Sequence, residues 1–123
     1  MESTNKLIYF NSRDSLIRIP VSKIVYFESD GNYTYVVVTN KLKACLSMNL
    51  SHTEQAMSEQ LGGSAHVFMR IGKRFIINMR YIYQIDMAKQ QLILSDFENF
   101  TFFVPVSKDA LKNVKQLLIH TKI

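Results

Sequence analysis

The stretch FMRIGKRFIINMRYI, from Phe68 to Ile82, decides how this chain is interpreted. Three cationic side chains, Arg70, Lys73 and Arg74, directly precede an apolar run from Phe75 to Asn78. A short apolar run of this kind predicts a buried strand, which would hold the cations in a fixed position. The segment therefore predicts a rigid basic surface that is suited to phosphate groups.

The length and composition of the chain predict one domain, residues 1–123, with one hydrophobic core. The chain has 123 residues, of which 47% are hydrophobic, and this length favours one core over two. The single cysteine, Cys45, excludes an intrachain disulfide, and its place in an alternating segment predicts a small buried side chain. No segment approaches the roughly 18 apolar residues of a membrane span, and the N-terminus lacks a signal-peptide pattern. These observations predict a soluble, cytoplasmic protein.

The basic residues are distributed unevenly. Residues 65–89 and 107–123 contain nine of the 15 Lys and Arg residues, but only two of the 10 acids, Asp86 and Asp109. This asymmetry predicts a cationic face such as polyanion-binding proteins carry, and it is equally compatible with a solvated basic surface.

Alternating apolar residues and turn signals predict a mainly β fold, with antiparallel strands in several small sheets and two short α-helices. Before the basic stretch we expect strands at Lys6–Phe10, Ser15–Pro20, Lys23–Ser29, Tyr33–Thr39 and Leu42–Met48. From Phe75 onward we expect strands at Phe75–Asn78, Ile82–Met87, Gln91–Ser95 and Phe100–Val106, with a hairpin turn at Asp96–Asn99.

Two segments change to a helical period. Ser51 and Glu54 form a capping-box pattern, and the helix that follows has one apolar face (Leu50, Thr53, Met57, Leu61) and stops at Gly62-Gly63. Ser107 is expected to cap a second helix with a buried stripe made of Ala110, Leu111, Val114, Leu117 and Leu118. That stripe leaves three lysines at i, i+4 and i+7 on one exposed face: Lys108, Lys112 and Lys115.

The residues that carry catalysis in other proteins are scattered here. His52, His66 and His120 lack the spacing of metal ligands and are predicted to be surface residues. Glu28 and Asp30 lie close together, but Asp30 falls in a turn, where its side chain bonds to its own backbone. We therefore expect no catalytic residue, no cofactor, no metal site and no small-molecule substrate.

Several motifs, in order along about residues 4–120, are similar to the LytTR family of bacterial DNA-binding domains. They are Tyr26-Phe27-Glu28, Gly31-Asn32-Tyr33, the pair Phe68 and Arg70 ahead of Ile76-Ile77-Asn78, Ile82, and Val104-Pro105-Val106-Ser107. The resemblance implies a fold of small antiparallel sheets that binds DNA through loops. It also implies that loop residues enter successive major grooves on one side of the duplex.

Carried over residue by residue, the resemblance implies the following contacts. Base contacts are expected from Asn32, Thr34, Lys73, Arg74 and Ser107, and phosphate contacts from Arg70, Lys108, Lys112 and Lys115. Family members often have a His–basic–Ser sequence where this chain has Gly72-Lys73-Arg74. The chemistry of the residues agrees, because Arg and Lys reach guanine O6 and N7 and a helix start offers N–H groups to phosphate.

Some side chains have an alternative role inside the fold. Arg70 is assigned either to DNA or to an ion pair with Glu28 or Asp86, and Asn78 is expected to be a turn residue. Four aromatic residues are expected to pack in the core: Tyr26, Phe68, Phe75 and Tyr81.

The resulting hypothesis is a sequence-specific DNA-binding transcriptional regulator, a lone LytTR-like domain that binds double-stranded DNA and pairs with a second copy on repeated elements. Because no phosphoacceptor domain is expected within 123 residues, control falls either to the amount of protein or to a separate partner. In stand-alone relatives this partner is often a membrane protein. The alternatives are a protein–protein interaction module whose basic face binds an acidic partner and, more remotely, an enzyme with an unrecognised site.

Overall fold

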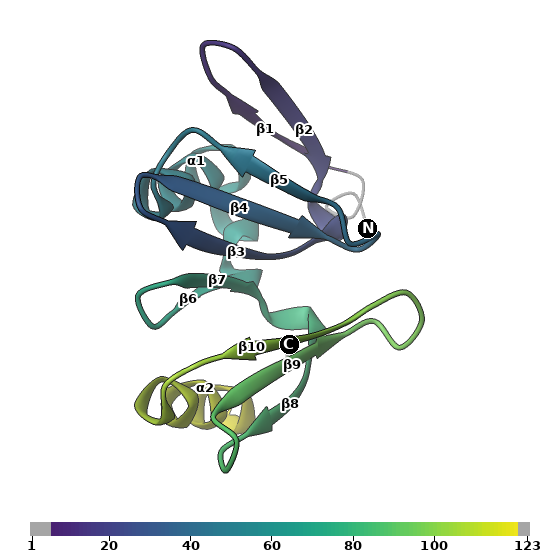
Figure 1. Ribbon diagram of the computed structural model, residues 1–123, viewed down its shortest axis with the longest axis vertical. Coiled ribbons are helices and arrows are strands. Elements are labelled where there is room, and N and C mark those ends of the chain that lie inside the picture. The colour runs from purple at the N-terminus through teal and green to yellow at the C-terminus, as the bar shows by residue number, and fades with distance from the viewer. Residues whose placement is uncertain (1–5, 121–123) are drawn as a thin grey trace.

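The structure, a computed structural model, describes residues 6–120. Within this range ten strands form three antiparallel sheets, accompanied by two α-helices (Figure 1). The predicted mainly β fold with several small sheets is therefore confirmed. Neither of the described helices is long and apolar enough to cross a membrane.

A five-stranded sheet with the strand order β5-β4-β3-β7-β6 forms the middle of the molecule. Its strands are β3 (Ile24–Asp30), β4 (Tyr33–Val38), β5 (Lys43–Leu46), β6 (Phe68–Ile71) and β7 (Phe75–Asn78). The basic stretch with Arg70, Lys73 and Arg74 forms the β6–β7 hairpin. Strand β6 was not among the expected strands, because its four residues gain their partner only when β7 pairs with them.

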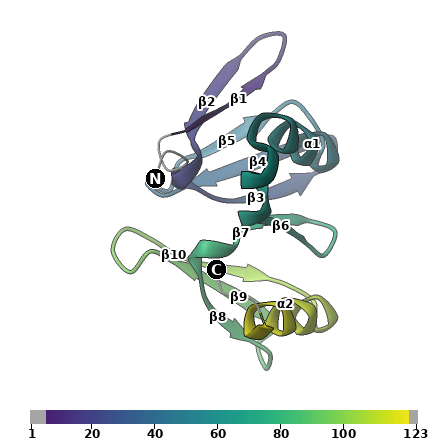
Figure 2. The same cartoon turned by 180° about the vertical axis from the view of Figure 1, so that it is seen from behind.

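Smaller units cover both faces of this sheet (Figures 1 and 2). On one side lie the hairpin of β1 (Leu7–Asn11) and β2 (Leu16–Pro20) and helix α1 (Leu50–Leu61). On the other side lie helix α2 (Lys108–His120) and a three-stranded sheet of β8 (Ile82–Asp86), β9 (Gln91–Ser95) and β10 (Thr101–Pro105). Short 3-10 helices link the units at Val21–Lys23, Gly62–Val67 and Met79–Tyr81.

The buried side chains form two clusters, which differs from the single core expected from chain length. Ile76 packs with Phe27 and the residues of α1, whereas its neighbour Ile77 packs with Leu92 and α2 on the opposite face. All four residues of β7 are buried because both faces of this strand are covered. Strand β7 therefore joins the two clusters into one structure.

Helix α1 begins differently from the predicted capping box. Asn49 is the N-cap, and its side chain accepts a hydrogen bond from the His52 backbone N–H at 2.8 Å. Ser51 lies inside the helix, and Glu54 pairs with Arg70 instead of capping. Asn and Ser are about equally good N-caps, so local sequence does not separate them. The predicted apolar face of this helix is confirmed.

The prediction that Cys45 is buried is wrong. The side chain is exposed, because Ala44 and Leu46 face the cluster beneath α1 and Cys45, between them, lies on the opposite face of β5. The alternation in this segment also begins later than expected. Leu42 precedes the strand and is 64% exposed.

Candidate nucleic-acid interface

Three chain segments that carry the expected DNA contacts lie along one side of the molecule. They are the turn between β3 and β4, the turn between β6 and β7, and the start of α2. All three are on the left in Figure 1 and on the right in the reversed view of Figure 2. They are distributed along the long axis of the molecule, as an edge that follows a duplex requires.

The β3–β4 turn presents Asn32 to solvent. Gly31 has a φ of +62°, a conformation that glycine adopts without strain, and Asn32 is exposed. The structure argues against the expected base contact of Thr34. This residue is completely buried, and its hydroxyl donates to the Met48 carbonyl at 2.9 Å. Side chains alternate along a strand, so the exposed Tyr33 places Thr34 on the inner face.

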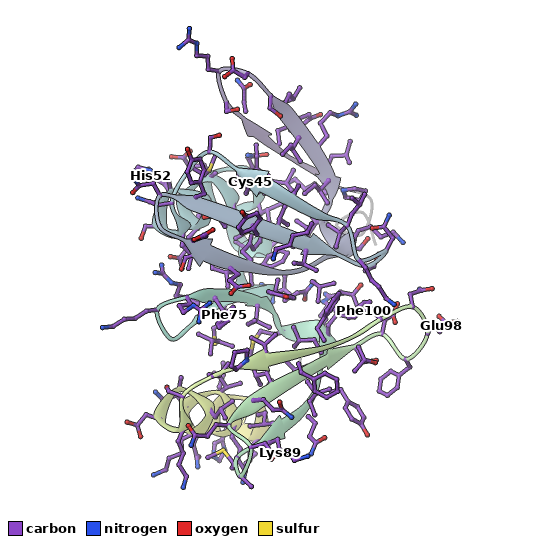
Figure 3. The ribbon with its side chains drawn as sticks, viewed as in Figure 1. Cys45, His52, Phe75, Lys89, Glu98 and Phe100 are labelled. Atoms are coloured by element: carbon purple, nitrogen blue, oxygen red, sulfur yellow. The ribbon has the colours of Figure 1, made fainter. Side chains whose placement is uncertain are left out.

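The β6–β7 turn presents two cations. Gly72 has a φ of +65°, which accounts for a glycine at this position, and the following Lys73 and Arg74 are exposed. The completely buried strand β7 begins at Phe75, directly after these cations (Figure 3). A buried strand, paired on both edges, thus supports the basic turn, as the sequence predicts.

Arg74 connects the β6–β7 turn to the end of β3. Its Nη2 lies 2.6 Å from Glu28 Oε2, and its guanidinium carbon lies 5.4 Å from the centroid of the Phe75 ring. The backbone N–H of Ser29 donates to the Arg74 carbonyl at 2.8 Å. The Arg74 side chain remains 59% exposed, so these contacts orient the guanidinium without covering it.

Arg70 forms an ion pair within the protein, as one of its two expected roles predicts, but its partner is Glu54. Its Nη1 lies 3.3 Å from Glu54 Oε1 on α1, and neither Glu28 nor Asp86 pairs with it. Its Nη2 also donates to the Lys73 carbonyl at 3.4 Å. Arg70 therefore links α1 to the basic turn and is one-third exposed.

The start of α2 agrees with its predicted cap. The Ser107 hydroxyl accepts a hydrogen bond from the Ala110 backbone N–H at 3.3 Å. Leu111 and Val114 are buried, which places the lysine stripe on the solvent side: Lys108, Lys112 and Lys115 are all exposed. The helix thus presents three ammonium groups next to its own N-terminus.

The three histidines and the possible metal ligands of the described residues lie apart from one another. His52, His66 and His120 are exposed, as predicted. Among residues 6–120, no group of three or more His, Cys, Asp or Glu side chains is placed to hold a metal ion.

One contributor to the interface was missed by sequence reasoning, namely Glu28 as the partner of Arg74. Glu28 pairs in register with Phe75 across β3 and β7, and this register brings its carboxylate beside Arg74. The only signal in the sequence was the opposite charge of the two residues. A separation of 46 residues gives no reason to choose this pair over others.

The model of the LytTr DNA-binding domain family matches residues 14–119. The chain belongs to the LytTR family. The solved LytTr DNA-binding domain of a Bacillus cereus protein superposes with a TM-score of 0.59 at 24% identity, covering 91% of this chain and 95% of that one. No curated protein matches the chain. Membership of the LytTR family supports DNA binding, and the shared fold agrees with it.

Proposed function

We propose that this LytTR protein is a sequence-specific DNA-binding transcriptional regulator that reads successive major grooves with loop residues. The observation that carries the proposal is the alignment of two turns and a helix start along one side of the molecule (Figure 1). Asn32, Lys73, Arg74 and Ser107 are the proposed base contacts. Thr34 is excluded because its hydroxyl is buried and already bonded.

The side chains of this edge suit different parts of the duplex. Arg74 uses one N–H for Glu28 and keeps further donors for guanine O6 and N7, where a bidentate contact discriminates between bases. The Ser107 hydroxyl accepts from Ala110 and still has its own proton to donate. The lysines of α2 are point charges on an exposed helix face, which suits phosphates better than bases.

Arg70 has a different proposed role. Because it pairs with Glu54 and donates to the Lys73 carbonyl, we assign it to positioning the basic turn in place of a phosphate contact. The Arg70 side chain is 33% exposed, whereas the paired Arg74 is 59% exposed, so Arg70 offers less of its guanidinium to DNA.

The wider hypothesis includes the partners and the control of the protein. We propose a cytoplasmic regulator that pairs with a second copy on repeated DNA elements. Its control, either by the amount of protein or by a separate regulatory protein such as a membrane protein, is a proposal drawn from the family resemblance.

Selection from a random DNA pool, followed by salt titration, tests the proposal. Counterion release makes affinity for DNA fall steeply with salt, and base contacts make the selected site bind more tightly than random DNA. Equal affinity for selected and random DNA would contradict sequence reading. A salt-dependent complex with an acidic protein, without measurable binding to DNA, would support the alternative of a protein–protein module.

A further inference from the structure

Phe97 stands at the tip of the β9–β10 turn in an unusual conformation. It is the most exposed large apolar side chain of the described residues, at 76%, and its φ is +68°. Its ring packs edge-to-face on Tyr83 with the centroids 5.3 Å apart. The turn projects away from the proposed DNA-binding side (Figures 1 and 2), and Figure 3 shows the neighbouring Glu98 on the side opposite His52.

Side-chain hydrogen bonds hold this turn in place. The Asp96 carboxylate accepts the backbone N–H groups of Glu98, Asn99 and Phe100 at 3.0, 2.7 and 3.2 Å. Desolvation raises the pKa of Asp96, but these bonds and the Asn99 amide outweigh it and lower the pKa to about 2. The Phe97 N–H donates to Ser95 Oγ at 2.9 Å. A bulky residue with positive φ is strained, and such strain concentrates at binding sites.

A groove elsewhere on the molecule has matching chemistry. It has a volume of about 470 Å³ and lies between β2 and the end of β4 that is remote from the β3–β4 turn. Its apolar lining includes Ile17, Ile19, Val36, Val38, Ala44 and the exposed Leu42. Arg18 and Lys23 also line it, and no lining residue is acidic.

The tip and the groove are complementary in shape and in charge. The tip is an aromatic wedge flanked by the carboxylates of Asp96 and Glu98, whereas the groove is an apolar hollow flanked by two cations. We propose that the β9–β10 tip of one copy binds in this groove of a second copy. The contact itself needs no DNA, but its use in pairing on repeated sites rests on the proposed function. Both surfaces leave the three DNA-facing segments free.

The contact is expected to be weak in solution and to gain strength on DNA. A few buried aromatic anchors carry most of the free energy of an interface, and Phe97 and Tyr83 are the anchors here. Neighbouring DNA sites raise the effective concentration of the two copies to the order of 1 mM. A weak contact then becomes sufficient to make binding cooperative.

Two variants each disrupt one of the two surfaces, the β9–β10 tip or the groove. Phe97→Asn removes the wedge, and asparagine tolerates positive φ, so the turn keeps its conformation. Leu42→Asp places a like charge in the groove opposite the acidic tip, at a side chain already exposed to solvent. Ile119→Asn is the matched control, because Ile119 is also a large exposed apolar residue, at 62%, and lies on α2. Dispersed NMR spectra of all variants establish that they fold.

The test is an NMR titration without DNA. A 15N-labelled Phe97→Asn copy, with its groove intact, is titrated with an unlabelled Leu42→Asp copy, whose tip is intact, up to about 1 mM. We expect saturable shifts at groove residues such as Ile19, Lys23 and Ala44. The shifts should vanish when the titrant also carries Phe97→Asn and persist when it carries Ile119→Asn. The proposal would be overturned if no shifts appeared or if they were confined to other surfaces. It would also be overturned if the shifts were the same with and without Phe97→Asn in the titrant.

A second measurement separates this inference from DNA binding itself. On DNA with a single element, Phe97→Asn should bind with the affinity of the wild type. On DNA with two elements, the same variant should lose cooperative binding. Retained cooperativity would contradict the use of the contact on DNA. Failure of the wild type to bind any selected site would instead refute the proposed function and leave the NMR result standing.

Discussion

At the scale of single residues, Arg74 and Glu28 form the contact with the clearest functional consequence. An exposed ion pair contributes about 0–1 kcal/mol to stability, so the 2.6 Å contact matters little for folding. Its effect is to hold a guanidinium in one orientation before DNA arrives. Preorganisation of this kind lowers the entropic cost of binding.

Glu28→Gln should separate orientation from charge. Removing a carboxylate near a polyanion favours all DNA, so affinity for random DNA should rise. Affinity for the selected site should fall relative to random DNA, by roughly 1 kcal/mol or less, because Arg74 loses its orienting partner. Gel-shift titration with both DNAs measures the two effects. Asp30→Asn is the matched control: it removes a nearby exposed carboxylate and should raise both affinities together.

Lys73→Ala and Arg74→Ala should each weaken binding to the selected site by about 1–3 kcal/mol and relax the preference at one or two base pairs. The reason is their exposure on a turn that the buried strand β7 supports. Binding assays with the selected site and its single-base variants provide the measurement. Lys89→Ala, which removes an exposed cation from the β8–β9 turn, should leave the preference unchanged. If the Lys73 and Arg74 variants keep the affinity and base preference of the wild type, another segment makes the base contacts.

At the scale of elements, α2 combines a buried face with a cationic face. Leu111 and Val114 anchor the helix against the cluster that includes Ile77 and Leu92, and its three lysines remain in solvent. The helix therefore has a fixed orientation relative to the turn that carries Lys73. In the proposed complex, an ammonium group on such a face contacts phosphate and positions the duplex without reading a base.

Replacing Lys108, Lys112 or Lys115 by Ala should reduce the slope of log K against log salt by about 1 for each lysine that contacts phosphate. The ratio of selected to random affinity should remain nearly unchanged. Salt titrations of the three single variants provide the measurement. An unchanged slope combined with a lost ratio would assign the lysine to base reading instead.

At the scale of the whole molecule, the two buried clusters share one strand. Ile76 belongs to the cluster beneath α1, and Ile77 belongs to the cluster beneath α2. A change in either cluster therefore acts on the same five-stranded sheet. We propose that residues 6–120 unfold as one domain.

Ile76→Ala and Ile77→Ala should each cost about 2–5 kcal/mol of unfolding free energy, because each leaves a cavity in a packed cluster. Both variants should retain a single unfolding transition. Hydrogen exchange at amides of β1 and β9 reports on the two sides separately. If Ile77→Ala released β9 while β1 kept the protection of the wild type, the clusters would be independent units.

The proposed pairing of two copies on DNA requires that both copies lie on one face of the duplex. A 14.3 kDa domain covers little duplex, so the proposal places two copies on elements separated by a whole number of helical turns. Inserting about 5 base pairs between the elements rotates one by half a turn and should abolish cooperative binding, whereas about 10 should preserve the common face. Gel shift measures the cooperativity. Undiminished cooperativity after the half-turn insertion would refute a common face.

The sequence by itself determined the elements, their order and much of the exposed edge. Alternation and turn residues are local signals, and for this reason most strands, the Ser107 cap, the buried stripe of α2 and its exposed lysines were predicted. The glycines of the two turns likewise mark positions where φ is positive. Motif order identified the family before any contact was known.

Only the tertiary structure decided which partners the side chains have and which faces are covered. Arg74 bonds to Glu28, Arg70 bonds to Glu54, and Thr34 turns inward to the Met48 carbonyl. The exposure of Cys45 and the division into two clusters also depend on which layer lies against which part of the sheet. Alternation states which side chains share a face, but it does not state what covers that face. That choice is made by strands and helices that are distant in sequence and meet only in the folded chain.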